Sequence, residues 1–410
     1  MTTPALPAPG GVSLGAGRVE WDARGAVSIT GASGEAVASD GVAAALAALA
    51  VSGATAGPLV GRPSSSASPA VSGAESAFAA DVDMTSWALI VGSTHIVKVP
   101  RHLGTADRGA RLQRLVAENA PALVPPVVGT VEHADTGTLV AVVTARVPDA
   151  TDGWSWAVDA LMEHLDGGAD PSFPDELGTL TAQLHVALAA ATATSRTTPR
   201  ARGAEERAAA VAVLADVIAH GAGAAERPGA AQRLAARSAA LRDLIDALPD
   251  PTAPEFALHG DLHVGQVLRD GDGRLRVIDF DGDPQHPAGD DVGDAARDVA
   301  HLQVSIDLVG AIVAKRRGAD DTRIAQWCRT AQERLVAAYD AVAPSYGGQP
   351  LLDPARLPGL RAARLVRELR YARDFLPRWA YAADWAIAHR FSADPNLEDP
   401  PWTPPAFSTT

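Results

Sequence analysis

The chain has 410 residues, of which 47% are hydrophobic and 20% charged, and its formal net charge is −14. This length suits a bilobal enzyme with an extension. The acidic balance argues against nucleic acid as a partner, because phosphate binding needs clustered Lys and Arg. Cys328 is the only cysteine, which excludes an intramolecular disulfide and a thiolate metal cluster. Without a secretory signal or an apolar run of membrane length, the chain is expected to be cytoplasmic and not membrane-bound.

The N-terminal segment is predicted to form short strands at 17–21 and 26–30 and a small helix near 42–51. Residues 62–72 are rich in Ser, Pro and Ala, a composition typical of a linker or a loop. The pattern changes after this stretch, because apolar runs separated by turn residues begin. These runs indicate a second structural region.

Two hairpins are predicted in this region. Residues 88–99 form the first, with a turn at Gly92-Ser93 and Lys98 near its end. The second spans 127–144 and turns at Ala134-Asp135-Thr136-Gly137. A helix over 106–119 is expected between them. Residues 76–147 therefore indicate a small β-rich lobe.

After Pro148 the pattern becomes almost wholly helical, and 148–410 is interpreted as a larger helical lobe. Asp152 or Thr151 is expected to cap the first helix. Helices are predicted near 152–166, 175–195, 205–248 and 290–391. A strand-loop-strand unit at 256–280 interrupts them. A β-rich lobe followed by a helical lobe is the arrangement of the two-lobed kinases.

The strand-loop-strand unit carries a spacing that points to phosphoryl transfer. His259-Gly260-Asp261 is followed by Gln266 five residues later and by Asp279 eighteen residues later. Such a reaction needs a carboxylate at the acceptor hydroxyl and oxygen ligands for magnesium. Asp261 is predicted to be the catalytic base. Gln266, Asp279 and the nearby Asp281 are predicted magnesium ligands, since amide and carboxylate oxygens suit this ion.

Lys98 ends a strand and is the candidate cation for the nucleotide phosphates, although a solvated strand-end lysine remains the alternative. No Gly-x-Gly-x-x-Gly precedes it, so the loop at 73–83 is a candidate cover for the phosphates. Its acidic partner is left unassigned. The adenine is expected to lie against the segment after the second hairpin, which consists of Thr144, Ala145, Arg146 and Val147.

These residues resemble the aminoglycoside phosphotransferase-like kinases and, among them, the actinobacterial maltokinases and glucosamine kinases. The resemblance covers nearly the whole chain after about residue 75. It is carried by Thr151-Asp152-Gly153-Trp154, Leu177 to His185, His259 to Gln266, Ile278 to Pro284, Arg297 to Ala300 and Leu376-Pro377-Arg378-Trp379. It implies an α+β, eukaryotic protein kinase-like bilobal fold that uses ATP and Mg²⁺, with an N-terminal cap domain over 1–75.

The resemblance also bears on the acceptor. The chain is shorter than the maltokinases and departs from them around 75–83 and 371–374. Carboxylates that follow the predicted catalytic loop, His259 to Gln266, and others that gather near the C-terminus suit an ammonium-bearing sugar better than a neutral disaccharide. The predicted substrate residues are Asp298, Glu368, Asp374 and Trp379, although Asp298 is alternatively a brace for the catalytic loop. His185 and His263 are expected to be buried, hydrogen-bonded histidines.

The leading hypothesis is a monomeric, ATP-dependent kinase that phosphorylates glucosamine to glucosamine 6-phosphate. A maltokinase is the first alternative, and another small-molecule kinase such as an antibiotic phosphotransferase is the second. A pseudokinase that binds nucleotide without turnover is a third. The missing Gly-rich loop favours this last alternative, whereas the intact Asp261, Gln266 and Asp279 oppose it.

Overall fold

A computed structural model of the chain describes residues 6–405, except 32–40, 65–70, 72, 78–85, 105–106, 193–198, 222–227, 284–291, 344 and 346–347. The chain divides into two compact units. The first comprises Met1–Ala150 and Leu268–Pro284, and the second comprises Thr151–Val267 and Gln285–Thr410.

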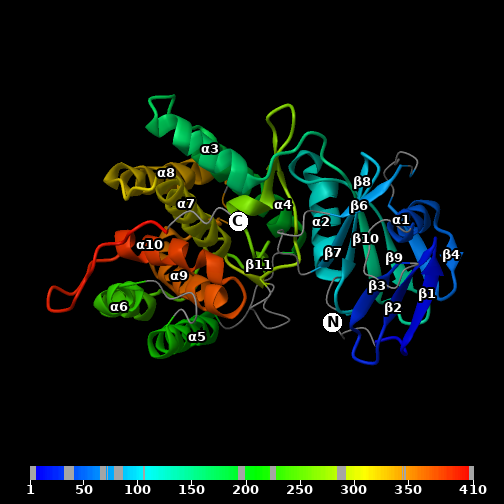
Figure 1. Ribbon diagram of the computed structural model, residues 1–410, viewed down its shortest axis with the longest axis horizontal. Helices are drawn as coiled ribbons and strands as arrows, with labels where there is room; N and C mark the ends of the chain where they lie inside the picture. Colours follow the sequence, from blue (N-terminus) through cyan, green and yellow to red (C-terminus); the bar gives the residue numbers. More distant parts are fainter. Residues whose placement is uncertain are drawn as a thin grey trace. The chain divides into compact units, whose positions relative to one another are not determined.

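The first unit is built on a seven-stranded antiparallel sheet (Figure 1). Val, Ile and Leu dominate its central strands, as expected for strands with a buried face. Ala88 of β7 lies opposite Lys98 of β8, so the predicted first hairpin is confirmed. The second hairpin is confirmed as well. In sheet order the strands are β4 (Thr55–Ala56), β5 (Leu59–Pro63), β9 (Val127–His133), β10 (Leu139–Ala145), β8 (His95–Pro100), β7 (Ser86–Val91) and β6 (Glu75–Ala77).

Helix α1 (Val42–Ser52) packs closely on this sheet through two glycines. A Cβ atom at Gly61 of β5 would collide with the carbonyl oxygen of Leu49, and one at Gly129 of β9 with that of Ala50. The absence of side chains at these positions lets the helix backbone rest on the strands. Helix α1 also contacts β8, the strand that carries Lys98.

The N-terminal strands form a separate three-stranded antiparallel sheet of β1 (Gly10–Leu14), β2 (Gly17–Trp21) and β3 (Val27–Thr30). This sheet shares one hydrophobic core with the seven-stranded sheet. Backbone bonds also join it to the chain that follows β8, from Val27 N to Arg101 O at 2.8 Å and from Leu103 N to Gly25 O at 2.7 Å. The domain boundary predicted at residue 75 therefore does not separate two compact units.

The first unit also contains helix α2 (Asp107–Asn119), close to the predicted range of 106–119, and the short hairpin of β12 (Val267–Arg269) and β13 (Leu275–Val277). The hairpin turn is held by Asp270, whose carboxylate accepts from Asp272 N and Arg274 N. Asp279 follows β13 after one residue, Ile278, and belongs to the same unit as Lys98.

Helices make up nearly all of the second unit, together with a short antiparallel pair of β11 (Phe256–Ala257) and β14 (Val292–Gly293). Helix α7 is central, because every side chain from Asp298 to Ala314 is buried and the helix contacts α3, α8, α9 and α10. The Asp152 side chain accepts from Ser155 N at 3.1 Å, which confirms the predicted cap of α3. The helices are α3 (Gly153–Leu165), α4 (Phe173–Thr192), α5 (Pro199–His220), α6 (Ala230–Asp246), α7 (Ala296–Arg317), α8 (Thr322–Val342), α9 (Leu357–Asp374) and α10 (Ala380–Arg390). Within the described ranges, none combines the length and apolar character that crossing a bilayer requires.

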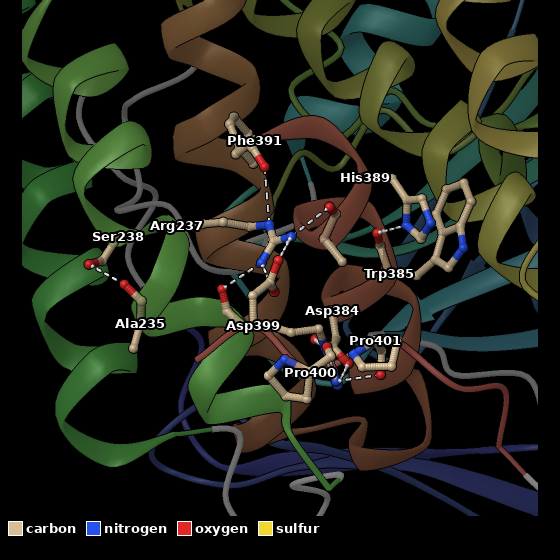
Figure 2. A network of polar contacts seen from close by, with 12 residues as sticks. Ala235, Arg237, Ser238, Asp384, Trp385, His389, Phe391, Asp399, Pro400 and Pro401 are labelled. Atoms are coloured by element: carbon tan, nitrogen blue, oxygen red, sulfur yellow. Dashed lines mark hydrogen bonds and ion pairs between the residues drawn. The ribbon is translucent and has the colours of Figure 1, made fainter. Parts of the chain in front are cut away.

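Two arginines of α6 fasten the C-terminal segment to the helices of this unit (Figure 2). Arg237 donates to the Phe391 carbonyl at 3.1 Å and pairs with Asp399, with NH2 lying 2.9 Å from Oδ2. Arg233, one turn earlier, forms a bidentate ion pair with Asp384 of α10. Its Nε atom lies 2.9 Å from Oδ1, and its NH2 atom donates to Oδ2. The Arg233 and Asp384 side chains are only 2% and 6% exposed, so their charges compensate each other away from water.

Asp384→Ala is expected to lower the free energy of unfolding by about 3–5 kcal/mol, because it leaves the Arg233 guanidinium buried without its carboxylate. The matched control is Asp246→Ala, which breaks an exposed pair with Arg242 on the same helix. That change is expected to cost about 0.5 kcal/mol or less. Urea unfolding followed by tryptophan fluorescence measures both. Equal midpoint shifts in the two variants would show that burial does not set the strength of the Arg233 pair.

Candidate active site

Lys98 forms two ion pairs within the first unit. Its Nζ atom lies 2.7 Å from Asp279 Oδ1 and 3.1 Å from Asp281 Oδ2. Burial by itself would lower the pKa of Lys98, but the two carboxylates outweigh burial and the pKa is raised. Lys98 is therefore charged at neutral pH. The partner that sequence reasoning left unassigned is this carboxylate pair, which lies more than 180 positions later in the chain.

The backbone around these carboxylates is unusual. Asp279 has a φ of 64°, in the left-handed region that residues other than glycine seldom adopt. Such strain persists where the surroundings impose it, and it concentrates at functional sites. Burial raises the pKa of the Asp281 carboxyl, and the opposing charge of Lys98 does not cancel this effect. Two carboxylates beside a single lysine leave an excess of negative charge when ionised, and this favours the binding of a further cation.

Helix α2 packs against these residues, a contact that the sequence did not indicate. The Arg108 guanidinium donates a short hydrogen bond to the Phe280 carbonyl. A Cβ atom at Gly109 would collide with Asp281 Oδ1, so only glycine leaves room for that carboxylate. The paired Arg108-Gly109 at a helix start is the signal that could have suggested such an approach. Arg108 thereby fixes the Phe280 carbonyl, and Gly109 lets the helix approach Asp281 closely.

The segment predicted to contact adenine follows β10. Its Ala145 N–H donates to Pro126 O at 2.9 Å, and its Arg146 N–H donates to Thr94 O at 2.8 Å. These two donors are therefore occupied within the protein. The adenine-binding role of Thr144, Ala145, Arg146 and Val147 stays a prediction, and it would have to use other atoms of this segment.

The loop predicted to cover the phosphates lies partly outside the described residues, which omit 78–85. Its Glu75 has a structural partner instead. The Glu75 carboxylate accepts from Ala44 N at 2.6 Å and from Gly41 N at 3.2 Å, at the start of α1. Because Gly41 offers no side-chain cap, Glu75 satisfies the exposed N–H groups of that helix.

In the second unit, Asp298 of α7 braces the catalytic loop. Its carboxylate accepts from His259 N at 2.8 Å and from Gly260 N at 3.0 Å, and it lies 3.3 Å from His185 Nε2. Burial by itself would raise the pKa of Asp298, but the His185 bond and the other contacts hold it below its ordinary value. With both oxygens engaged and 2% exposure, Asp298 fits the brace that the sequence offered as its alternative role, and not a substrate contact.

Asp261, which follows this braced turn, lies among charged groups from two helices. Its Oδ1 atom is 3.5 Å from Arg364 NH2 on α9 and 3.6 Å from His301 Nδ1 on α7. Its Oδ2 atom is 3.8 Å from His263 Nε2. Glu368 completes the group, because its Oε1 atom lies 2.7 Å from Arg364 NH2. Arg364 and His301 were not singled out from the sequence, since neither lies near Asp261 along the chain.

A row of rings extends from the catalytic loop. His263 stacks with Trp154 of α3 at 5.6 Å between ring centroids, Trp154 meets Trp379 at 5.5 Å, and Trp379 meets Tyr381 at 6.5 Å. His263 is hydrogen-bonded as predicted, since its Nδ1 atom accepts from Gly265 N at 3.1 Å. Its side chain is 22% exposed, so it is half-buried where burial was predicted. The row therefore brings the predicted substrate residue Trp379 to the same part of the unit as Asp261.

The two remaining predictions for this unit differ in outcome. His185 is fully buried and lies 2.9 Å from the Tyr339 hydroxyl, as expected of a structural histidine. Asp374, at the end of α9, is exposed and pairs with Arg373 at 2.7 Å. Its charge is thus already balanced, which weakens its case as a substrate residue, although that role stays a prediction.

The predicted magnesium ligands fall in both units. Asp279 and Asp281 lie beside Lys98, and Gln266 ends the 3-10 turn Val264–Gln266 of the catalytic loop. Across the described part of the chain, no three His, Cys, Asp or Glu side chains cluster as an all-protein metal site. The two carboxylates of the first unit suit magnesium, which usually binds one or two carboxylates and takes its other ligands from water and substrate phosphates; the role of Gln266 stays a prediction.

A lysine on an antiparallel sheet paired with an aspartate, and a second aspartate braced after a His-Gly turn, define a phosphotransferase of the protein kinase-like fold. Comparison with known proteins agrees. Residues 76–344 match the model of the phosphotransferase enzyme family, and the chain belongs to this family.

Two sequence relatives and one solved structure that resemble the chain are glucosamine kinases. The chain is 34% identical over 319 residues to a glucosamine kinase of Mycolicibacterium smegmatis, covering 75% of this chain and 77% of the relative. It is 34% identical over 330 residues to a glucosamine kinase of Streptacidiphilus jiangxiensis, covering 75% and 71%. A solved glucosamine kinase in complex with glucosamine, ADP and inorganic phosphate superposes with a TM-score of 0.74 at 30% identity, covering 94% and 95%. The predicted fold class and family resemblance are confirmed.

Proposed function

We propose that this chain is a glucosamine kinase, which transfers the γ-phosphoryl group of ATP to the 6-hydroxyl of glucosamine. The observation that carries the proposal is the likeness to glucosamine kinases over most of the chain, including a structure with glucosamine and ADP bound. The charged groups around Asp261 and Lys98 supply the functions that this reaction needs.

On the nucleotide side, Lys98 is proposed to contact the phosphates of ATP. Its raised pKa keeps the ammonium charged, and the ammonium is held in place by Asp279 and Asp281. These two carboxylates, with Gln266, are proposed to hold Mg²⁺, which when bound neutralises charge on the transferred phosphoryl group. Without the metal, the two carboxylates would oppose the phosphates. The pseudokinase alternative loses support, because Lys98 has acidic partners.

On the acceptor side, Asp261 is proposed to orient the sugar hydroxyl and to accept its proton as the oxygen attacks phosphorus. The brace by Asp298 fixes the backbone on which Asp261 stands. Such positioning supplies much of the rate in phosphoryl transfer, because little covalent chemistry falls to the protein.

Glu368 is proposed to bind the ammonium of glucosamine, with Trp379 as an adjoining wall. The hydrogen bond and ion pairs given for the Glu368 carboxylate within the described residues involve Oε1, with Arg364 and His301 as partners. The second oxygen, Oε2, is therefore the acceptor proposed for the sugar ammonium. The carboxylate itself is 16% exposed, so a charge bound there is only partly screened.

Glucosamine is expected to be phosphorylated at least about a hundredfold more efficiently than glucose or N-acetylglucosamine, because either analogue leaves Oε2 of the partly buried Glu368 carboxylate without its ammonium partner. Glu368→Gln is expected to reduce the ratio of kcat/KM for glucosamine over glucose by about tenfold or more. Steady-state kinetics with ADP production coupled to a sugar panel measures both ratios.

Asp374→Asn provides the comparison, since its carboxylate lies on the same helix but is exposed and paired with Arg373. A loss of preference in that variant alone would move the ammonium site from Glu368 to Asp374. If maltose is phosphorylated more efficiently than glucosamine at equal concentration, the maltokinase alternative replaces the proposed function.

A further inference from the structure

Two carboxylate oxygens in the second unit share the same two cationic neighbours. Arg364 NH2 lies 3.5 Å from Asp261 Oδ1 and 2.7 Å from Glu368 Oε1. His301 lies between the same two oxygens, with Nδ1 3.6 Å from Asp261 Oδ1 and Nε2 3.8 Å from Glu368 Oε1. The four side chains therefore close a ring in which carboxylates alternate with nitrogen groups.

The ring is shielded from solvent, and His301 is its most buried member. The His301 side chain is 7% exposed, against 12% for Arg364 and 16–18% for the two carboxylates. Charges at this depth interact more strongly than they would in water, because the surrounding dielectric is lower and salt screens them less.

The geometry favours one protonation state of His301. A neutral imidazole has one N–H donor, and its other nitrogen is an acceptor. Here each ring nitrogen faces a carboxylate oxygen, and a bare nitrogen would oppose the oxygen in front of it. Only the imidazolium presents a proton to both oxygens. It also balances the ring, since two carboxylates then face two cations.

We propose that His301 is a positioning residue for phosphoryl transfer, acting as an imidazolium that fixes the catalytic carboxylate. This inference rests on the proposed function. Together with Arg364, His301 lies against Oδ1 of Asp261 and so fixes the orientation of the carboxylate that accepts the hydroxyl proton. The hydroxyl oxygen bonds to phosphorus, the bond to the bridging oxygen of ADP breaks with its electron pair, and the hydroxyl proton passes to Asp261. His301 keeps its proton throughout.

The groups that face His301 come from two elements. Asp261 and the ring of His263, whose centroid is 5.5 Å away, belong to the catalytic loop. Glu368 belongs to α9, as does Arg364, which acts through the shared oxygens. The two carboxylates favour the imidazolium, whereas the guanidinium of Arg364 opposes it; His263 adds no charge, because its Nδ1 atom accepts a hydrogen bond from Gly265 N. As pH rises, loss of the His301 proton should release Asp261 and lower kcat.

His301→Gln is expected to lower kcat about tenfold to a hundredfold, while KM for ATP stays within about twofold, because no group beside Lys98 is changed. The part of the alkaline decline of kcat that comes from His301 should disappear in the variant, so its kcat should persist to higher pH relative to its maximum than that of the wild type. Saturating glucosamine in both proteins leaves only the groups of the enzyme–substrate complex in the profile. The matched control is His389→Gln, which changes another histidine near a carboxylate, 3.1 Å from Asp320. Its kcat and pH profile should follow the wild type.

A second readout does not depend on how well His301→Gln folds. In Glu368→Gln the imidazolium loses one carboxylate, so the alkaline decline of kcat should move by about one pH unit to lower pH. Wild-type kcat in His301→Gln, or an unmoved profile in Glu368→Gln, would overturn the role of His301. Failure of the proposed function shows separately, as wild-type protein that does not phosphorylate glucosamine at all.

Discussion

Asp261→Asn is expected to lower kcat by about a hundredfold or more while the affinity for ATP stays within about twofold. Asparagine has the size of aspartate and can remain in the braced loop, but it cannot accept the hydroxyl proton. The groups proposed to bind ATP phosphates, Lys98 and Asp279, are untouched. A coupled assay gives kcat, and titration calorimetry gives the affinity for ATP with magnesium.

The matched control for this change is Asp272→Asn, in the turn of the β12–β13 hairpin. The Asp272 side chain is 72% exposed and pairs only with its neighbour Arg274 among the described residues. Its kcat should equal that of the wild type. Near-normal turnover in Asp261→Asn would remove Asp261 from the role of base and leave the loop with a purely structural one.

The second large effect is expected at Asp279, where alanine should lower kcat by about a thousandfold or more. The change removes a proposed magnesium ligand and one of the two partners of Lys98. Nucleotide binding should weaken only in the presence of magnesium, because the carboxylate acts through the metal. Chelation of the metal should abolish wild-type activity. Calorimetry with and without magnesium, beside the coupled assay, measures all three outcomes.

The left-handed backbone of Asp279 requires a further variant. Asparagine tolerates this conformation nearly as well as aspartate, so Asp279→Asn removes the charge without adding backbone strain. It should reproduce the loss of metal-dependent binding. Asp135→Ala, at the exposed turn between β9 and β10, is the unchanged control. Equal ATP affinity with and without metal in every protein would contradict a magnesium site at Asp279.

Features that depend on neighbouring residues were predictable. The β7–β8 hairpin follows from apolar runs around Gly92, and the α3 start follows from Asp152, whose side chain caps Ser155 N. Both are set by dihedral preferences and by bonds that span a few residues. The spacing of Asp261, Gln266 and Asp279 could be read from the sequence for the same reason, because all three residues lie within one strand-loop-strand unit.

Strand β5 shows why other parts of the fold were missed. Leu59–Pro63 is short, contains Gly61 and ends in proline, so its local pattern does not indicate a strand. It forms because it pairs with β9, where Arg62 lies 3.2 Å from Glu132, a residue 70 positions later. The same non-local pairing merges the predicted cap with the β-rich lobe.

The sequence by itself determined the class of chemistry, the two hairpins and the helical character of the second half, and it predicted the residues that are proposed to carry the reaction. Only the tertiary structure decided what those residues touch. It paired Lys98 with Asp279, made Asp298 a brace and set His301 between Asp261 and Glu368. The physical reason is range. Periodicity and turn chemistry act over a few residues, whereas contacts across more than a hundred positions depend on packing of the whole unit.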